Sequence, residues 1–305
     1  MEKARYIWMD GELVGWDDAT VHVLTHTLHY GVGAFEGIRC YKGTDGRSAV
    51  FRLREHIVRL AQSCHILGLP TPYDVDTMVD ACLATIRANE LDECYIRPLV
   101  YVGYGEMGLA ATVDNPVRLS IATWPWASYL GADGLANGIR VHTSSFARFP
   151  VNSMMTKAKA CGHYVNSILA SVEARRGGYD EALMLDVDGY AAEGCGENLF
   201  VIRDGRVKTP PIATVLEGIT RNTAMDLLRD TGTEVTEERF TRDEIYISDE
   251  AFMTGTAAEV TPMASLDDRN IGTGKPGPIT KKLQEEYFAV IRGERPRYAS
   301  WLTYL

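Results

Sequence analysis

The sequence predicts an α+β fold of two domains, in which largely antiparallel sheets pack against helices. Asp-Gly pairs join strand-like runs in both halves of the 305-residue chain, and this pair suits the tight turns of antiparallel hairpins. Groups of strand-like runs are followed by groups of helical segments, twice along the chain. This clustering favours α+β over a doubly wound parallel sheet. The length corresponds to about two domains of roughly 150 residues each.

The first half of the chain is predicted to contain two hairpins and two helices. Asp10-Gly11 and Asp45-Gly46 mark the hairpin turns. One helix begins near Leu53 and a second helix follows, because apolar residues recur on one face of each segment. These faces comprise Ile57, Leu60, Ala61, Cys64 and Leu67 in the first helix, and Met78, Val79, Cys82, Leu83 and Ile86 in the second.

The second half repeats this organisation. Hairpin turns are expected at residues 188–189 and 204–205. The apolar residues Val165, Ile168, Leu169 and Val172 mark one face of a helix that ends before a glycine pair. Thr220 is the expected N-cap of the next helix, and a last helix covers residues 279–291. The tail from Gly293 is irregular but rich in aromatic residues, so we expect it to pack against a domain.

The boundary between the domains is expected where Pro, Gly and aromatic residues interrupt the pattern. This interruption separates predicted strands at residues 118–123 and 139–143. Residues 1–122 are therefore expected to form a smaller α/β domain, residues 123–135 an interdomain loop and residues 136–305 a larger domain.

Charge and composition exclude several classes of partner. The net charge of −10 disfavours nucleic acid and anionic membrane surfaces, because both would be repelled. No apolar run approaches the roughly 18 residues of a membrane helix, and the first residues lack the apolar core of a signal peptide. The six cysteines form no C-x-x-C pair, which indicates reduced thiols. A cytoplasmic protein is therefore expected. The cysteines are Cys40, Cys64, Cys82, Cys94, Cys161 and Cys195.

Two motifs resemble ligand sites without their expected context. The sequence GYGEMG at 103–108 fits G-x-G-x-x-G and follows a strand-like run at 96–102. A dinucleotide site would need a helix next and an acidic residue about 20 positions later. Pro116 and another strand follow instead, and residues 123–130 contain no acid. A glycine-rich connection between antiparallel strands is favoured over a nicotinamide oxidoreductase.

Three histidines, His22, His26 and His29, have a spacing that could place them on one helical face. The neighbouring Val21, Val23 and Leu24 give an equally good strand signal, and no carboxylate lies nearby in the sequence. Structural histidines with satisfied hydrogen bonds are therefore expected, and no metal site is predicted.

Two of the eight lysines lie in an unusual setting. Lys157 and Lys159 sit in MMTKAKACGHYV, among small and apolar residues just before a helix. Burial disfavours an ammonium group, so a lysine here could act as a nucleophile or base. A solvated lysine at a helix start is the equally weighted alternative.

Downstream loops offer the partners of a flat, phosphorylated cofactor. Residues 190–200 place Glu193 and Glu197 among glycines, including Gly196, where a backbone can approach a flat ligand closely. A carboxylate there could keep a pyridinium nitrogen protonated. Residues 216–220, before a helix, and residues 254–258, after a strand, offer backbone N–H groups for a phosphate.

Eight separated segments together resemble the branched-chain-amino-acid aminotransferases, within the fold-type IV class of pyridoxal-phosphate enzymes, which has the D-amino-acid aminotransferase-like architecture. The resemblance spans nearly the whole chain. Cys161 and Cys195 depart from the family pattern, as does Glu217 where proline is common, but no catalytic group is missing. The segments are HYGVGAFEGIRCY (29–41), FRLREHIVRL (51–60), YIRPL (95–99), PWASYLGA (125–132), AKACGHY (158–164), EGCGENLF (193–200), LEGITR (216–221) and GTAAEVTP (255–262).

The resemblance assigns cofactor roles residue by residue. Lys159, in the larger predicted domain, is implied as the catalytic Schiff-base lysine, because it precedes Gly162-His163-Tyr164 as in the family motif. Tyr164 is implied to bond the phenolic oxygen of pyridoxal 5′-phosphate, and Glu193 its ring nitrogen. The other implied cofactor-binding residues are Arg59, Ile219, Thr220 and Thr256 at the phosphate, Leu216 against the ring, and Gly196 in the glutamate loop.

The implied activity is transfer of the amino group of leucine, isoleucine or valine to 2-oxoglutarate by a ping-pong mechanism. A homodimer or higher homo-oligomer is also implied, with some residues contributed by the neighbouring subunit. D-amino-acid aminotransferase, (R)-selective amine transaminase and aminodeoxychorismate lyase share the cofactor motifs and stay open, and a catalytically inactive binding protein of the same fold is the alternative from another class. The implied substrate-binding residues are Tyr30, Phe35, Gly37, Tyr95, Arg97, Met107, Leu109, Trp126, Tyr129, Thr256 and Ala257.

Overall fold

The computed structural model describes residues 2–126 and 130–305. The chain forms two compact units. The first comprises Met1–Trp126, Lys157–His163 and Ala289–Leu305, and the second comprises Ala127–Thr156 and Tyr164–Phe288. Both units contain helices and largely antiparallel strands, so the predicted α+β class is confirmed.

A mixed-order sheet forms the centre of the first unit. Its strands run in the order β17-β5-β4-β6-β7-β1-β2, with β3 paired to β6, and every pairing among these described strands is antiparallel. The elements are β1 (Tyr6–Met9), β2 (Glu12–Gly15), η1 (Trp16–Asp18), α1 (His26–Tyr30), β3 (Gly33–Phe35), β4 (Ile38–Lys42), β5 (Ser48–Phe51), α2 (Leu53–Ile66), α3 (Val75–Ala88), β6 (Cys94–Val102), η2 (Leu109–Val113), β7 (Val117–Trp124), η3 (Cys161–His163), η4 (Pro296–Trp301) and β17 (Leu302–Tyr304).

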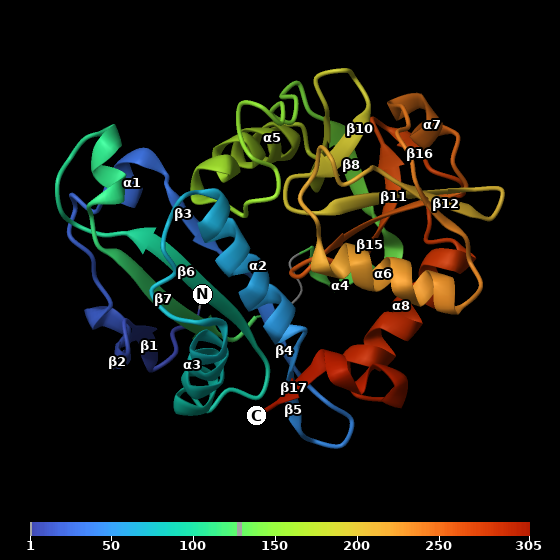
Figure 1. Cartoon of the computed structure of the whole chain (residues 1–305). Coiled ribbons are helices and arrows are strands. Elements are labelled where there is room, and N and C mark those ends of the chain that lie inside the picture. Colours follow the sequence, from blue (N-terminus) through green and yellow to red (C-terminus); the bar gives the residue numbers. More distant parts are fainter. Residues whose placement is uncertain (1, 127–129) are drawn as a thin grey trace. The chain divides into compact units, whose positions relative to one another are not determined.

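The two faces of this sheet differ because side chains alternate along each strand. Helices α2 and α3 pack side by side, and α3 contacts β6 and β7 (Figure 1). Ile38 and Cys40 of β4 and Ile96 of β6 join the buried cluster that includes the helices' apolar residues. Arg39 and Tyr95, which are directly paired across β4 and β6, therefore lie on the opposite face.

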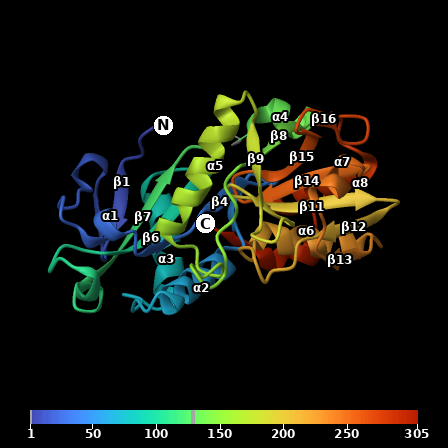
Figure 2. The same ribbon diagram turned by 90° about the horizontal axis from the view of Figure 1, so that it is seen from above.

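The second unit contains a larger sheet, with the strand order β10-β9-β8-β15-β14-β11-β12-β13 and β16 paired to β15 (Figure 2). Three of its pairings, β8–β9, β8–β15 and β12–β13, are parallel. Helix α5 packs on β9, and α6 packs on β14. The elements are α4 (Gly131–Asn137), β8 (Ile139–Thr143), α5 (Tyr164–Arg176), β9 (Glu181–Leu185), β10 (Ala191–Gly194), β11 (Asn198–Arg203), β12 (Arg206–Thr209), α6 (Ile219–Asp230), β13 (Val235–Glu237), α7 (Arg242–Tyr246), β14 (Glu250–Gly255), β15 (Glu259–Leu266), β16 (Arg269–Asn270) and α8 (Pro278–Ile291).

The units differ from the predicted domains 1–122 and 136–305 in two segments. Lys157–His163 groups with the first unit, because Gly162 N–H donates to the Gly31 carbonyl and Ala160 bridges to Ala34. The chain from Ala289 also groups with the first unit, because β17 pairs with β5. The predicted irregular tail thus contains a short strand that supplies its packing.

Two of the four Asp-Gly turns form the predicted tight hairpins. Asp10-Gly11 and Asp204-Gly205 have positive φ at both residues and join directly paired strands. At Asp45-Gly46 only the glycine has positive φ, and the flanking pair is Lys42 with Ser48. At residues 188–189 the flanking pair is likewise wider. In these two cases the connection is a longer loop, which a short-range signal cannot distinguish.

Two details of the predicted helices are wrong. The N-cap of α6 is Gly218, so Thr220 lies inside the first turn. The apolar residues of α5 that were expected to face a core, such as Val165 and Ile168, are more than half exposed, whereas Ala170 and Ala174 are buried. Small side chains face the sheet because α5 packs closely on β9.

Candidate active site

Lys159 lies in a short segment just before η3, and its backbone is firmly held. Its N–H donates to Ser63 Oγ over 3.0 Å, and its carbonyl accepts the Phe35 N–H over 3.1 Å. The flanking residue Ala160 is buried and bridges to Ala34. The Lys159 ammonium nitrogen lies 5.3 Å from the centre of the Phe35 ring. The lysine therefore has a fixed backbone and a half-buried side chain.

Close backbone contact explains two glycines beside this segment. Gly31 caps α1 with a φ of +71°, a conformation that favours glycine. A side chain on Gly31 would begin 3.1 Å from Gly162 Cα. Gly162 N–H donates to the Gly31 carbonyl over 3.0 Å. These two glycines let the lysine segment approach the end of α1.

Arg59 and His56 lie one turn apart on α2, and both contact Glu36. Arg59 donates from Nε to Glu36 Oε1 over 2.7 Å and from Nη2 to Oε2 over 2.8 Å. The ring nitrogen Nδ1 of His56 lies 2.7 Å from Glu36 Oε2. Burial opposes ionisation of Glu36, but the charges of Arg59 and His56 outweigh it and hold the pKa of this carboxyl well below its usual range.

Predicted substrate residues gather on the face of the sheet opposite α2 and α3. The Arg97 guanidinium lies 4.8 Å from the Phe35 ring centre and 5.2 Å from the Tyr95 ring centre. The Tyr95 ring lies 5.0 Å from that of Trp126. A side chain at Gly37 would collide with the Tyr95 hydroxyl, which would lie 1.9 Å from the added carbon. Gly37 thus makes room for Tyr95.

This face is rich in hydrogen-bond donors and poor in acceptors. Among the described residues, several buried N–H groups on it have no hydrogen-bond partner: Arg39 Nε and Nη1, Arg97 Nε, Trp124 Nε1 and Trp126 Nε1. Arg97 does donate from Nη2 to the Tyr95 hydroxyl over 3.2 Å. Unpaired buried donors are costly. Such a surface favours a ligand that carries acceptor oxygens.

Three predicted substrate residues are exposed instead. Tyr30 is 39% exposed, Met107 42% and Leu109 80%. The segments that carry them meet, because His26 Nε2 on α1 bonds the Gly108 carbonyl over 3.0 Å. No described contact joins these three side chains to Arg97. The remaining predicted substrate residue of this group, Tyr129, lies outside the described residues.

Glu193 is the central acid of the second unit. It lies on β10, is 6% exposed, and accepts the Leu216 N–H over 3.3 Å. Arg148 Nε lies 2.5 Å from its Oε1. Because the N–H does not align with the carboxylate for a hydrogen bond, this contact is an ion pair. The positive charge favours the ionised carboxylate.

Asn198 joins the elements around Glu193. It pairs with Glu193 across β10 and β11, and with Thr254 across β11 and β14. Its side-chain amide donates to the Leu216 carbonyl over 2.9 Å. A side chain on Gly218 would collide with Asn198 Oδ1. The structure therefore brings the predicted residues Glu193, Leu216 and the start of α6 together.

Two backbone segments of this unit offer N–H groups. Helix α6 begins at Ile219, and its N-cap Gly218 supplies no side-chain acceptor to the first turn. The first N–H groups of a helix lack intrahelical partners and bind anions. Thr256 and Ala257 lie in the tight turn that joins β14 to β15 after the paired residues Gly255 and Glu259.

The remaining predicted residues have local partners. Gly196 N–H donates to Glu197 Oε2 over 2.9 Å, and a side chain at Gly196 would enter open space. Tyr164 is the first residue of α5. Burial raises the pKa of Cys161 to about 11 and raises that of Cys195 beyond its usual range. Both thiols are protonated near neutral pH and are expected to react slowly.

Four functional candidates were not identified from the sequence: Glu36, Arg39, Arg148 and Asn198. Three of them lie inside segments that carry the resemblance, and Glu36 and Arg39 are charged residues in an otherwise apolar run. That contrast was a usable signal. Arg148 lies in ARFPV, outside these segments. Only its tertiary contact with Glu193 reveals it.

The motifs set aside in the sequence have structural partners. The glycine-rich stretch at 103–108 joins the antiparallel strands β6 and β7, as predicted. His22 Nδ1 accepts the Leu24 N–H, and His29 Nε2 contacts the Val23 carbonyl. The stretch around Val23 is not a strand, because the chain bends there before α1. Within the described residues, no cluster of three metal-ligating side chains occurs, and no helix is both long and apolar enough to cross a bilayer.

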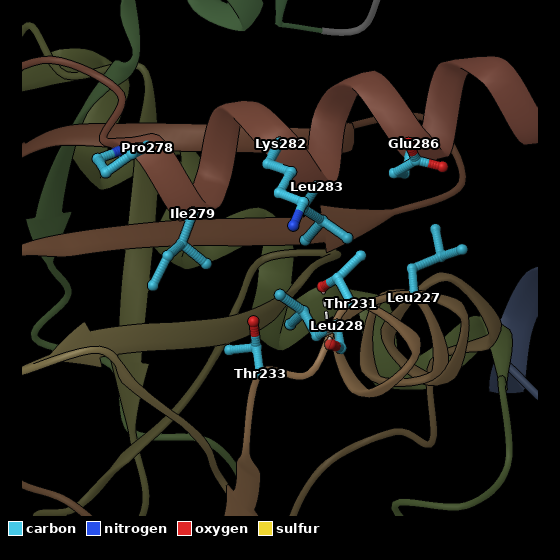
Figure 3. A pocket seen from close by; sticks show the side chains of 9 residues that line it. All are labelled: Leu227, Leu228, Thr231, Thr233, Pro278, Ile279, Lys282, Leu283 and Glu286. Atoms are coloured by element: carbon cyan, nitrogen blue, oxygen red, sulfur yellow. Dashed lines mark hydrogen bonds between the residues drawn. The ribbon is translucent and has the colours of Figure 1, made fainter.

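A separate hollow lies between α6 and α8 (Figure 3). Leucine and isoleucine side chains form most of its wall, and Thr231 donates to the Leu228 carbonyl over 2.9 Å. It contains no residue predicted from the sequence. Its lining comprises Leu227, Leu228, Thr231, Thr233, Pro278, Ile279, Lys282, Leu283 and Glu286.

A family model described as amino-transferase class IV matches residues 33–266. The chain belongs to this family. As a class IV aminotransferase it is a transferase enzyme, so the nicotinamide oxidoreductase is excluded.

Relatives with similar sequence cover nearly the whole class IV chain. The branched-chain-amino-acid aminotransferase of Pseudomonas aeruginosa is 52% identical over 97% of this chain and 96% of its own length. A solved branched-chain amino acid aminotransferase from Escherichia coli is 46% identical, with a TM-score of 0.94 over 98% of this chain and 99% of that chain. A third relative, a branched-chain amino acid aminotransferase complexed with N-(5′-phosphopyridoxyl)-L-glutamate and designated T.th., is 45% identical, with a TM-score of 0.95 over 100% of this chain and 99% of that chain. The predicted resemblance and fold are confirmed.

Proposed function

We propose that this enzyme transfers the amino group of leucine, isoleucine or valine to 2-oxoglutarate with pyridoxal 5′-phosphate as cofactor. The names of its relatives support the reaction. One structural observation carries the substrate choice. The guanidinium of Arg97 is surrounded by the rings of Phe35, Tyr95 and Trp124, so apolar surface and a carboxylate partner occupy the same place.

The described residues fit this cofactor chemically. A phosphate needs N–H donors, which Arg59 and the uncapped start of α6 at Ile219 and Thr220 can supply. A protonated ring nitrogen needs an ionised carboxylate, and Glu193 beside Arg148 meets that need. Lys159 supplies an amine on a fixed backbone. We propose that Tyr164 bonds the phenolic oxygen, Leu216 packs on the ring, and Gly196 and Thr256 complete the binding set.

The chain's own residues then have distinct tasks. When bound, pyridoxal phosphate supplies a carbonyl carbon that accepts the amino group and a ring that withdraws electrons from the substrate Cα. Lys159 takes the proton from Cα as a general base and returns it as a general acid. Glu193 holds the proton on the ring nitrogen. Arg59, Ile219 and Thr220 anchor the phosphate, so the reacting atoms stay aligned with Lys159.

One subsite must receive two kinds of side chain in turn. We propose that Phe35, Tyr95 and Trp126 contact the aliphatic side chain of a branched-chain amino acid. Arg97 then receives the distal carboxylate of glutamate or 2-oxoglutarate through charge-assisted hydrogen bonds. Gly37 keeps space for Tyr95, and Thr256 and Ala257 bind the α-carboxylate. The glutamate adduct bound to a similar enzyme supports such a subsite.

We also propose that the enzyme is a cytoplasmic homodimer or higher homo-oligomer. Six free thiols suit a reducing compartment. The exposed apolar side chains of Tyr30, Met107 and Leu109 would be covered by a second copy, whose site they would complete. Sedimentation of wild type and of Leu109→Asp tests this. A monomeric wild type would refute the proposal.

An amino-donor panel with 2-oxoglutarate as acceptor tests the activity. L-leucine, L-isoleucine and L-valine should react faster than D-alanine and (R)-1-phenylethylamine. Glutamate formation is the readout common to all donors. If D-alanine or the (R)-amine is preferred, the enzyme is one of the alternative transaminases that share the same cofactor motifs.

A further inference from the structure

Glu36 is a fully buried carboxylate that no reaction step above uses. It follows β3 directly, is 0% exposed, and receives three contacts between 2.7 and 2.8 Å. Two come from Arg59 and one from His56. All three residues belong to the first unit. A buried carboxylate is retained in a fold only where cations or N–H groups compensate its lost hydration.

The two contacts with Arg59 fix more than its position. Nε and Nη2 each donate to a different oxygen of Glu36. This side-by-side arrangement holds the planar guanidinium in one orientation, which a single hydrogen bond cannot do. The two bonds use two of the five N–H donors that an arginine carries. The direction in which the rest of the guanidinium points is therefore set by Glu36.

His56 completes the arrangement from the same helix. It is 1% exposed, and Nδ1 contacts the Glu36 oxygen that also accepts from Arg59 Nη2. Burial lowers the pKa of His56, although Glu36 opposes this shift. A neutral ring that donates from Nδ1 keeps Glu36 between two partners on α2.

The backbone on either side of Glu36 connects this cluster to the lysine segment. Phe35 N–H, one residue earlier, donates to the Lys159 carbonyl. The Glu36 N–H itself donates to the Pro98 carbonyl of β6 over 2.9 Å. The residue that orients Arg59 thus has a backbone fixed between Lys159 and the central strand.

We propose that Glu36 is a positioning residue that aims Arg59 at the phosphate group of the cofactor. The proposal rests on the phosphate role of Arg59 given under the proposed function. Glu36 does not touch the phosphate, since two anions would repel each other. It acts through the guanidinium, whose charge it partly balances and whose plane it fixes.

The test compares two probes that differ only in the phosphate. The full-length chain, freed of cofactor, is titrated with pyridoxal 5′-phosphate and with pyridoxal, and binding is followed by the absorbance of the lysine-bound form. Glu36→Gln should weaken binding of the phosphorylated probe about tenfold or more, and leave pyridoxal binding nearly unchanged. Inorganic phosphate should also compete less well against pyridoxal 5′-phosphate in this variant.

A matched variant on the same helix controls for the loss of a carboxylate. Glu55→Gln removes the partner of Arg52, an i,i+3 pair on α2 with a partly exposed carboxylate, and should leave the preference for the phosphorylated probe unchanged. If Glu36→Gln does not fold, Glu36→Asp replaces it. Aspartate keeps the charge but withdraws it by one methylene, so part of the phosphate preference should be lost.

Arg59→Ala separates this inference from the assignment beneath it. If Arg59→Ala keeps the wild-type preference for the phosphorylated probe, the phosphate role of Arg59 fails, and this inference fails with it. If Arg59→Ala loses the preference and the Glu36 variant keeps it, only the positioning role of Glu36 is overturned. Loss in both variants, with Glu55→Gln unchanged, supports the proposal.

Discussion

Arg148 and Glu193 form an ion pair in which Nε lies 2.5 Å from Oε1, and both side chains are 8% exposed. A buried carboxylate without a cation would tend to take up a proton. Arg148 therefore keeps Glu193 ionised before any ligand arrives. The same pair fixes one oxygen of Glu193, while Leu216 N–H holds the other.

Breaking this pair should destabilise the second unit. Arg148→Met removes the cation and leaves a buried carboxylate, which typically costs roughly 3–5 kcal/mol. The double variant Arg148→Met/Glu193→Gln should recover part of that loss, because no charge is then left unpaired. Chemical denaturation of the cofactor-free variants gives the free energies of unfolding.

An exposed ion pair provides the comparison. Arg229 and Asp226 are 3.9 Å apart, with side chains 53% and 47% exposed. Arg229→Met should cost at most about 0.5 kcal/mol. An Arg148→Met enzyme that loses no more stability than Arg229→Met would show that the buried pair is not a strong one.

The two neighbouring lysines should behave differently. Lys159→Ala should abolish transamination and the visible absorbance of the lysine-bound cofactor, because this lysine has its backbone held by Ser63 and Phe35. Lys157→Ala should keep most of both. Absorbance spectra and single-turnover assays of the two variants decide the matter. Equal loss in both variants, or loss at Lys157 alone, contradicts the assignment of Lys159.

Glu193 and Glu197 are both buried acids of the same loop. Glu193→Gln keeps the shape but removes the charge, so the cofactor should still bind while turnover falls by about a hundredfold or more. Glu197→Gln is the matched control, since Glu197 accepts the Gly196 N–H, and it should retain far more activity. Steady-state kinetics of both variants provide the measurement. Near-normal turnover of Glu193→Gln would point to Glu197 as the partner of the ring nitrogen.

His56 should make the fold sensitive to mild acid. Burial lowers the pKa of His56 from its ordinary value of 6.5, with Glu36 opposing and Arg59 and Lys159 assisting the shift. The unfolded chain therefore binds a proton that the folded chain refuses, so stability falls as pH drops below about 6.5. The pKa of Glu36 is also depressed, but its stabilising contribution is lost only below the ordinary range of a carboxyl.

Thermal midpoints at pH 7 and pH 5 test this prediction. The midpoint of wild type should fall over this interval, and that of His56→Gln should fall less. His65→Gln, which changes a histidine in the last turn of the same helix, should fall as wild type does. A fall in His56→Gln equal to that of wild type would show that another group is responsible.

Local patterns in the sequence were sufficient for some features and insufficient for others. Helices α2 and α3 follow from their apolar periodicity, because their buried faces match it. The face of α5 does not follow, since Val165 is exposed while Ala170 packs inward. Periodicity shows that a helix has an apolar face but cannot show which side a sheet will cover.

The candidate site divides in the same way. Lys159 and Glu193 were identified because ordered motifs carry them. Glu36 and Arg148 were not, because their importance lies in partners 23 and 45 residues away, at Arg59 and Glu193. Ion pairs formed by folding leave little local trace in a single sequence.

Arg97 should separate the two substrates of the enzyme. Its guanidinium is enclosed by aromatic rings, its Nε has no partner among the described residues, and Nη2 holds the Tyr95 hydroxyl. Arg97→Ala removes the only cation proposed for the distal carboxylate of 2-oxoglutarate. Loss of a buried charge-assisted pair costs roughly 2–5 kcal/mol, so the Michaelis constant for 2-oxoglutarate should rise more than about tenfold.

Leucine offers no distal carboxylate, so its half-reaction should change little in Arg97→Ala. Steady-state kinetics of both half-reactions in this variant provide the measurement, and Arg118→Ala serves as the control. Arg118 lies on the adjacent strand β7 with its side chain half exposed beside Asp10, and its loss should affect neither substrate. If leucine and 2-oxoglutarate suffer alike in Arg97→Ala, then Arg97 acts by holding Tyr95 in place. The subsite would then need a different cation, and Arg39, which lies opposite Tyr95 with unpartnered guanidinium nitrogens among the described residues, would be the first to replace.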